Sequence, residues 1–149
     1  MSKLIIADLF SGVGGLSQGF ISQGFEVEFA IEYDKDIALS YQKNHPSTKM
    51  YSQDISTIDF EELKKNHSKI DVVVGGPPCQ GFSIFGNRRF INTKGFKPKS
   101  DKRNNLVLKF WRYVELIKPT WVIMENVAGF PSTILASTEG RKVTVLFKS

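Results

Sequence analysis

The sequence predicts an α/β fold, with a doubly wound, mainly parallel sheet and helices on both faces. Short apolar runs alternate along the chain with stretches of helical periodicity, which is the pattern of parallel sheets. The run Ile70–Val74 is β-branched along most of its length, as expected for a strand covered on both faces. The chain has 149 residues, 41% of them hydrophobic, which is enough for one packed core.

The first half of the chain supplies strands and helices in alternation. Leu4–Leu9 is an apolar run that leads into a glycine-rich turn, which predicts a buried strand. Val13–Gln23 predicts a helix closed by Gly24, because glycine readily adopts the left-handed conformation at helix ends. Asp36–Asn44 predicts a helix that stops before Pro46. The other elements predicted here are the strands Val27–Ile31 and Lys49–Gln53 and the helix Phe60–His67.

The second half contains a long loop between two further strands. After the strand Ile70–Val74, residues 76–104 are rich in Gly, Pro, Asn and Lys, and a loop of this length inside a compact domain is usually functional. A final strand is predicted at Trp121–Met124, and Arg141–Phe147 is compatible with one more strand in the tail. An apolar stripe at helical spacing lies between the loop and the final strand: Leu106, Val107, Phe110, Tyr113, Val114 and Ile117.

Bulk composition excludes several classes of protein. The chain has one cysteine, Cys79, so no disulfide can form within it, and a reducing compartment, the cytoplasm, is the predicted location. No apolar run approaches the roughly 20 residues that span a bilayer, and the first residues do not form a secretory signal. No metal site is predicted. A lone cysteine is more often a core residue than a catalyst, so composition alone gives Cys79 no role.

The net charge of +5 is concentrated in one segment. Residues 86–103 hold seven of the 20 lysines and arginines but only one of the 15 acidic residues, so the rest of the chain is close to neutral. A concentrated positive loop is typical of binding to a polyanion such as nucleic acid. A solvated surface loop explains the same charge run equally well.

A glycine-rich turn follows the first predicted strand, in the sequence Asp8-Leu-Phe-Ser-Gly-Val-Gly-Gly15. Glu32 ends the second predicted strand, twenty residues after Gly12, where a carboxylate can bind both hydroxyls of a ribose. The pair favours a nucleoside ligand over a simple strand-to-helix turn, although Ser17 only loosely meets the small third position of a dinucleotide fingerprint. Asp54 can accept from an adenine amino group or, equally well, cap a helix or turn.

The setting of Cys79 points beyond simple packing. It lies in Gly75-Gly-Pro-Pro-Cys-Gln-Gly-Phe-Ser83, after a buried strand and before the basic loop. Pro77 and Pro78 hold the backbone extended, and the flanking glycines let large groups approach. A cysteine that only packs needs none of these features, so the sequence predicts a positioned thiol nucleophile.

Three segments resemble sequence motifs of the cytosine-5 DNA methyltransferases, in that family's order. They are residues 8–15, residues 77–83 (Pro-Pro-Cys-Gln-Gly-Phe-Ser) and residues 125–127 (Glu-Asn-Val), similar to the first, fourth and sixth motifs. Gly81-Phe82-Ser83 resembles the DNA enzymes more than their tRNA-modifying relatives. The resemblance implies a Rossmann-like S-adenosylmethionine-dependent methyltransferase fold, incomplete at the C-terminus. Residues 1–130 would form a partial catalytic and cofactor-binding domain, followed by an atypical tail at 131–149.

The resemblance implies transfer of a methyl group from S-adenosylmethionine to C5 of cytosine in DNA. Cys79, in the same motif as Pro78, would attack C6 of the ring as a thiolate, which makes C5 nucleophilic. Glu125 would hold or protonate N3, for which the alternative is a surface carboxylate at a strand end. Asn126 would help to hold the loop that carries the cysteine.

The resemblance also implies contacts with the cofactor and with double-stranded DNA. Phe10 and Tyr33 would lie near the adenine, Glu32 would bind the ribose, and Asp54 would bind the adenine amino group. The other implied cofactor residues are Gly12, Gly14, Gly15 and Ile55. A base inside a duplex must be flipped out to be reached, and the basic loop matches the family's mobile loop, which closes over DNA. The DNA contacts expected from this match are Gln80, Ser83, Arg88, Arg89, Lys97 and Arg103.

The family's later motifs and its target recognition domain are absent from this sequence. A sheet that stops after its fifth strand is expected to expose an open apolar edge. Three interpretations remain: one subunit of a split methyltransferase completed by a second chain, an inactive truncated remnant, or a non-enzymatic module that binds cofactor or DNA.

Overall fold

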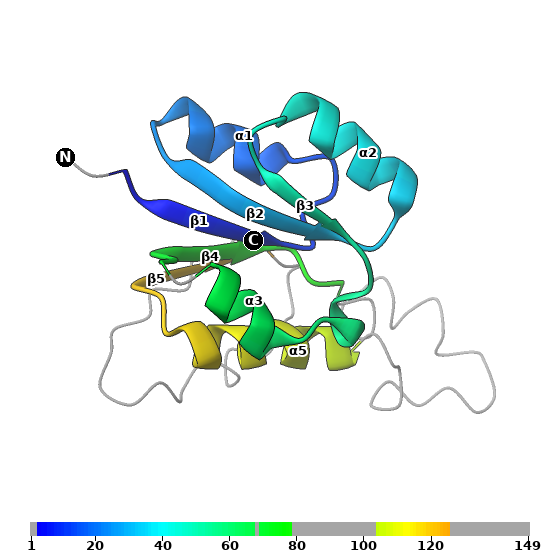
Figure 1. The fold of residues 1–149 in the computed structure, drawn as a ribbon, viewed down its shortest axis with the longest axis vertical. Coiled ribbons are helices and arrows are strands. Elements are labelled where there is room, and N and C mark those ends of the chain that lie inside the picture. The colour runs from blue at the N-terminus through cyan, green and yellow to red at the C-terminus, as the bar shows by residue number, and fades with distance from the viewer. Residues whose placement is uncertain (1–2, 68, 79–103, 126–149) are drawn as a thin grey trace, which may run out of the picture.

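The computed structural model describes residues 3–67, 69–78 and 104–125, and it confirms the predicted α/β architecture. The strands are β1 (Ile5–Leu9), β2 (Glu26–Glu32), β3 (Lys49–Ser52), β4 (Val72–Gly75) and β5 (Trp121–Met124). The helices are α1 (Gly15–Ser22), α2 (Lys35–Asn44), α3 (Phe60–Asn66), α5 (Asn104–Ile117) and the short 3-10 turn η1 (Ile55–Thr57). The strands pair in parallel in the order β3-β2-β1-β4-β5. Helices α1 and α2 cover one face of this sheet, and α3 and α5 cover the other (Figure 1).

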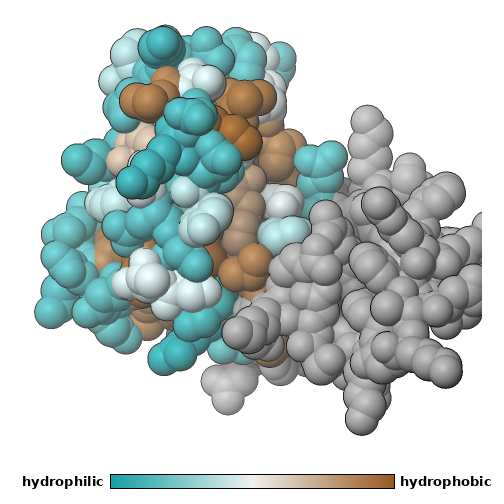
Figure 2. All heavy atoms as spheres, turned by 90° about the vertical axis from the view of Figure 1, so that its right-hand side faces the viewer, coloured by the Kyte–Doolittle hydropathy of each residue, from teal (hydrophilic) through white to brown (hydrophobic). Residues whose placement is uncertain are grey.

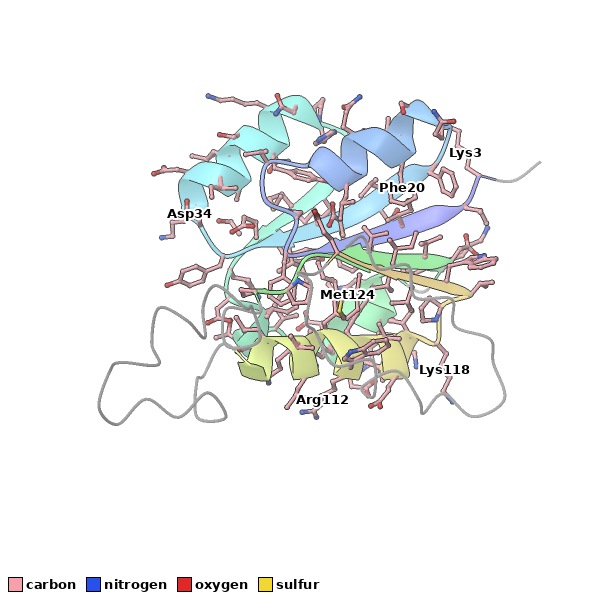
Figure 3. All side chains as sticks on the ribbon, turned by 180° about the vertical axis from the view of Figure 1, so that it is seen from behind. Lys3, Phe20, Asp34, Arg112, Lys118 and Met124 are labelled. Carbon is pink, nitrogen blue, oxygen red and sulfur yellow. The ribbon has the colours of Figure 1, made fainter. Side chains whose placement is uncertain are left out.

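Each face of the sheet has its own apolar core. The larger core lies under α3 and α5, where Phe110 and Tyr113 pack against Phe29 and Met124. The smaller core joins the opposite face to α1, with Phe20 beside the buried residues of β1, β2 and β4. Figure 3 shows Phe20 and Met124 on opposite sides of the sheet. Strands buried on both faces explain why their sequences are apolar runs rather than alternating patterns.

Two elements start later than their apolar patterns predict. Helix α1 begins at Gly15 rather than Val13, because Gly12 and Gly14 have φ angles of 57° and 94°, which no right-handed helix accommodates. Gly24 ends this helix region with a φ of 85°, as predicted. Strand β4 runs over Val72–Gly75 rather than Ile70–Val74. Asp71 precedes it, where its backbone oxygen accepts from Thr120 N and Trp121 N at the start of β5.

The strand order places a switch point at β1. Strand β1 pairs with β2 on one side and with β4 on the other, and ligands of doubly wound sheets bind beyond the carboxyl ends of the strands at such a point. Figure 2 looks onto that edge of the molecule, where hydrophobic side chains form a broken band among hydrophilic ones. No helix in the described ranges is both long and apolar enough to cross a membrane.

Candidate functional site

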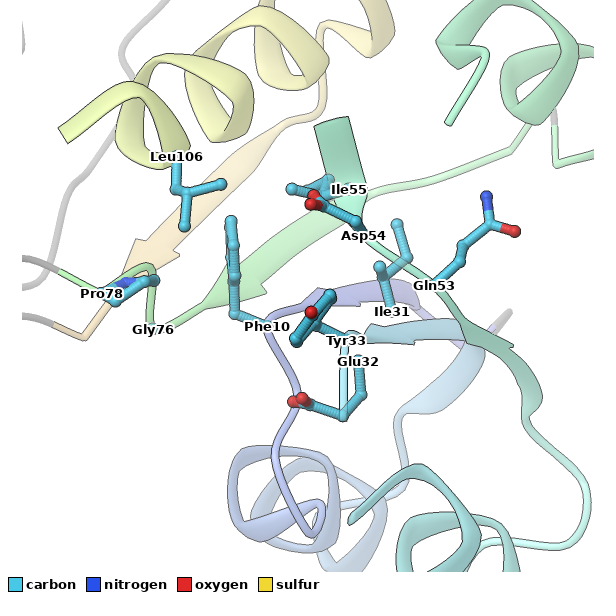
Figure 4. Close-up of a pocket in the computed structure, with 10 residues that line it drawn as sticks. All are labelled: Phe10, Ile31, Glu32, Tyr33, Gln53, Asp54, Ile55, Gly76, Pro78 and Leu106. Atoms are coloured by element: carbon cyan, nitrogen blue, oxygen red, sulfur yellow. The ribbon is translucent and has the colours of Figure 1, made fainter. Parts of the chain in front are cut away.

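A cavity of about 390 Å³ opens at this edge, within the range usual for small-molecule sites. In Figure 4, Leu106 of α5 lies above Phe10, and Gly76 and Pro78 lie across the cavity from Ile55. The lining comes from the end of β2, from the segments after β1, β2, β3 and β4 and from the start of α5, and its polar side chains are two carboxylates, an amide and a phenol. The lining residues are Phe10, Ile31, Glu32, Tyr33, Gln53, Asp54, Ile55, Gly76, Pro78 and Leu106.

Glu32 links the glycine turn to the end of β2. Its Oε2 accepts from Gly12 N at 2.9 Å, and its Oε1 accepts from Asp34 N at 2.9 Å. A carboxylate has about four lone-pair positions, so each oxygen keeps capacity for a hydroxyl donor from a ligand. The two backbone hydrogen bonds fix the carboxylate at the cavity wall.

Asp54 caps a turn and also borders the cavity. It caps η1, because its Oδ1 accepts from Ser56 N at 2.8 Å, and it also lines the cavity. Capping uses one carboxylate oxygen and points Ile55 into the core, where it is buried. The other oxygen has capacity for a ligand amino group.

Two aromatic residues border the cavity, one with an unusual backbone conformation and one with an unusually exposed side chain. Phe10 has a φ of 63°, a left-handed conformation that is rare for a bulky residue and is concentrated at functional sites. Tyr33 follows Glu32 with 73% of its surface exposed, although large aromatic rings gain most from burial. Both rings line the cavity.

Glu125 lies beside the segment that leads into Cys79. The amide of Glu125 donates to the Gly75 oxygen at 3.0 Å, and its Oε2 is 3.9 Å from the position that a Cβ on Gly76 would take. Pro78, the last described residue before Cys79, lines the cavity. The carboxylate expected to act on the base therefore lies at the same sheet edge as the entry to the cysteine loop.

Five of the eight predicted cofactor residues line the cavity. The three glycines of the turn, Gly12, Gly14 and Gly15, are not part of this lining, although Gly12 N donates a hydrogen bond to Glu32. Leu106 and Gln53 line the cavity without having been predicted, and the one signal for Leu106 was its place at the start of the apolar helical stripe. Other predicted residues lie outside the described ranges: Cys79, Asn126, Gln80, Ser83, Arg88, Arg89, Lys97 and Arg103.

A buried polar network lies behind the turn, and sequence reasoning missed it. Ser17 Oγ donates to Asp8 Oδ2 at 2.6 Å and lies 2.7 Å from the Tyr41 hydroxyl. All three side chains are fully buried. Burial raises the pKa of Asp8 to about 7, an effect that hydrogen bonds from Ser17 only partly offset. Burial likewise raises the pKa of Tyr41 to about 12.

Comparison with known proteins finds relatives of one kind, the type II methyltransferases. Over 127 residues, 85% of this chain, it is 41% identical to the type II methyltransferase M.DdeI of Desulfomicrobium norvegicum, of which that match covers 28%. Over 133 residues it is 39% identical to M.AquIA of Picosynechococcus, of which it covers 50%. The chain thus spans between about a quarter and a half of the length of these curated relatives.

Solved structures agree with the sequence relatives. A protein described as a DNA modification methyltransferase, encoded within an E. coli prophage, aligns over 89% of this chain and 35% of its own, with a TM-score of 0.70 and 34% identity. The DNMT2 of Spodoptera frugiperda aligns over 85% of this chain with a TM-score of 0.62 and 26% identity. The family model for the C-5 cytosine-specific DNA methylases matches residues 4–145. The chain therefore belongs to the C-5 cytosine-specific DNA methylase family.

Proposed function

We propose that this chain is the cofactor-binding and nucleophile-bearing part of a DNA cytosine-5 methyltransferase. The observation that carries the proposal is the position of Glu125, beside Gly76 at the edge where the cavity opens. One sheet edge thus combines a carboxylate for the target base, the entry to the cysteine loop and a cavity for the methyl donor. Such convergence of polar groups on an apolar cavity is typical of an active site.

The lining suits S-adenosylmethionine as the ligand. Glu32 would accept from the ribose hydroxyls and Asp54 from the adenine amino group, while Phe10, Tyr33 and Ile55 would enclose the ring. The cofactor supplies a methyl group on a sulfonium, ready for transfer. The residues fit the cofactor because two carboxylates with unused acceptor capacity lie on a mainly apolar wall.

The chemistry follows from Cys79 and Glu125. The Cys79 thiolate adds to C6 of the flipped cytosine, and Glu125 stabilises the charge that then builds up at N3. The resulting carbon nucleophile at C5 would take the methyl group from the sulfonium of S-adenosylmethionine, which would leave as the neutral thioether S-adenosylhomocysteine. Loss of the C5 proton and elimination of the thiolate restore the ring and release 5-methylcytosine. Attack by an activated thiol in this way is ordinary covalent catalysis.

A polypeptide segment outside this sequence is the proposed source of the family's later motifs. Among the described strands, β5 pairs only with β4, and Trp121 at its start is 45% exposed. An unpaired edge offers backbone donors and acceptors to an added strand. We therefore infer that a polypeptide with the later motifs and the target recognition domain completes the enzyme.

Transfer of labelled methyl from S-adenosylmethionine to mixed-sequence DNA tests the proposal, with Cys79→Ala as the matched control. The assay is run on the 149-residue chain alone and with a polypeptide that carries the later motifs. We expect label only in the combined reaction and none with the variant. Label from the chain alone would refute the need for a partner. Label that persists in the Cys79→Ala variant would refute the covalent mechanism.

A further inference from the structure

The glycine turn is supported from behind by α2, through contacts that lie outside the cavity. Gly14, the N-cap residue just before α1, has the left-handed conformation, and a Cβ at this position would collide with the rings of His45 and Tyr41. Those two rings pack together with centroids 4.6 Å apart. The turn therefore rests directly on one face of α2, at a distance that only glycine permits.

Tyr41 also holds α1 through a chain of buried hydroxyl groups. With Asp8 ionised, the single hydroxyl proton of Ser17 goes to Asp8 Oδ2, so Tyr41 must donate to Ser17 Oγ. Thr48, also buried, is hydrogen-bonded to Tyr41 in turn. Hydroxyl chains that end on a buried carboxylate polarise one another, and each bond strengthens the next.

Gly12, at the start of the same turn, is hydrogen-bonded to Glu32, the carboxylate proposed to bind the ribose. Gly12 N donates to Glu32 Oε2, and Glu32 Oε1 accepts from Asp34 N. Asp34 is the N-cap of α2, where its carboxylate accepts from Asp36 N and Ile37 N. The turn is therefore held at two points, through Glu32 just before α2 and through Tyr41 in the second turn of this helix.

We propose that Tyr41 is a positioning residue for the cofactor, which holds the glycine turn and the start of α1 in the shape that the ligand requires. This inference rests on the proposed function. Tyr41, Ser17 and Asp8 do not line the cavity, so their effect on a ligand acts through the turn. A preformed turn binds a ligand more tightly than one that must first be ordered.

Tyr41→Phe is the decisive variant, because it keeps the ring against Gly14 and removes only the hydroxyl. A net buried hydrogen bond contributes about 1 kcal/mol, so we expect amides of residues 14–18 to exchange roughly fivefold to tenfold faster in the ligand-free chain. The Kd for S-adenosylmethionine should rise by a similar factor. Tyr113→Phe is the matched control, since its hydroxyl is also buried but has no hydrogen-bond partner within the described part of the chain. It should leave both measurements unchanged.

Thr48→Val provides a second route if Tyr41→Phe folds poorly. It leaves the bond between Tyr41 and Ser17 in place but removes the donor that polarises it, so a smaller change in the same direction is expected. Exchange of the turn at the wild-type rate in both variants would overturn the inference, as would an unchanged Kd in Tyr41→Phe. Failure of the wild-type chain to bind S-adenosylmethionine would count against the proposed function instead, and the exchange rates would still decide whether Tyr41 holds the turn.

Discussion

Asp8→Asn tests the energetics of the carboxyl group beneath the glycine turn. Asp8 lies on β1 with no exposed surface, and its Oδ1 has no hydrogen-bond partner among the residues that the structure describes. Burial raises its pKa from 3.8 to about 7; hydrogen bonds from Ser17 lower the pKa in part, and the nearby charge of Glu32 raises it further. The folded protein therefore binds a proton at Asp8 more tightly than the unfolded chain does.

The sign of the pH dependence follows from this difference. The stability gained from the protonated form is fully present below pH 4 and is lost as the pH rises through about 7, so the free energy of unfolding falls across that window. The interval between 3.8 and about 7, at about 1.36 kcal/mol per pKa unit, corresponds to about 4 kcal/mol. Any water that reaches Asp8 Oδ1 would reduce this figure.

The assay is urea unfolding of the wild type and of Asp8→Asn at intervals from pH 4 to pH 8.5. Asparagine has nearly the same shape and carries no charge, so the difference between the two free energies isolates the ionisation of Asp8. We expect the free energy of unfolding of the variant, relative to that of the wild type, to rise by up to about 4 kcal/mol over this range. Repeating the series in 0.5 M salt should preserve the effect, because buried charges are screened little. A difference that does not change with pH would refute the reasoning.

Three further substitutions have defined outcomes. Tyr113→Phe should raise the free energy of unfolding by about 1 kcal/mol in urea titrations, because it removes a buried hydroxyl without a partner. Gly14→Ala should lower the melting temperature, because it combines a φ of 94° with a clash against Tyr41; an unchanged value would contradict that packing. Replacing Arg88 and Arg89 by glutamine should reduce the salt dependence of DNA binding by about two counterions; an unchanged slope would exclude them as phosphate contacts.

Much of the fold could be predicted because strands buried on both faces leave a strong pattern. All five strands were expected, and Trp121–Met124 has the predicted bounds. Glu32 and Asp54 could be found because polar residues directly after apolar strands must lie at the carboxyl edge of a parallel sheet. The start of α1 was predicted two residues too early, since apolar periodicity does not report the backbone angles of the preceding glycines.

Other parts of the site depend on packing that no local pattern reveals. Leu106 lines the cavity only because α5 packs over η1, a contact between segments about fifty residues apart. Tyr41 and His45 resemble ordinary core residues of an amphipathic helix, and their contact with Gly14 appears only in three dimensions. The roles of Cys79, the boundary at residue 130 and the DNA contacts stay predictions, because those residues lie outside the described ranges.

Ser17 shows why an imperfect match to a general motif can carry information. The third position of a dinucleotide fingerprint is kept small so that helix and strand pack closely, and the full burial of Ser17 is consistent with that demand. Here the hydroxyl also satisfies Asp8 and Tyr41. Alanine would meet the packing requirement but would leave both partners buried without that bond, at a cost of about 1–3 kcal/mol. The effects of substitutions at positions 8, 17 and 41 on the free energy of unfolding should therefore be strongly non-additive in double-mutant cycles. The spacing of the glycines alone does not predict this coupling.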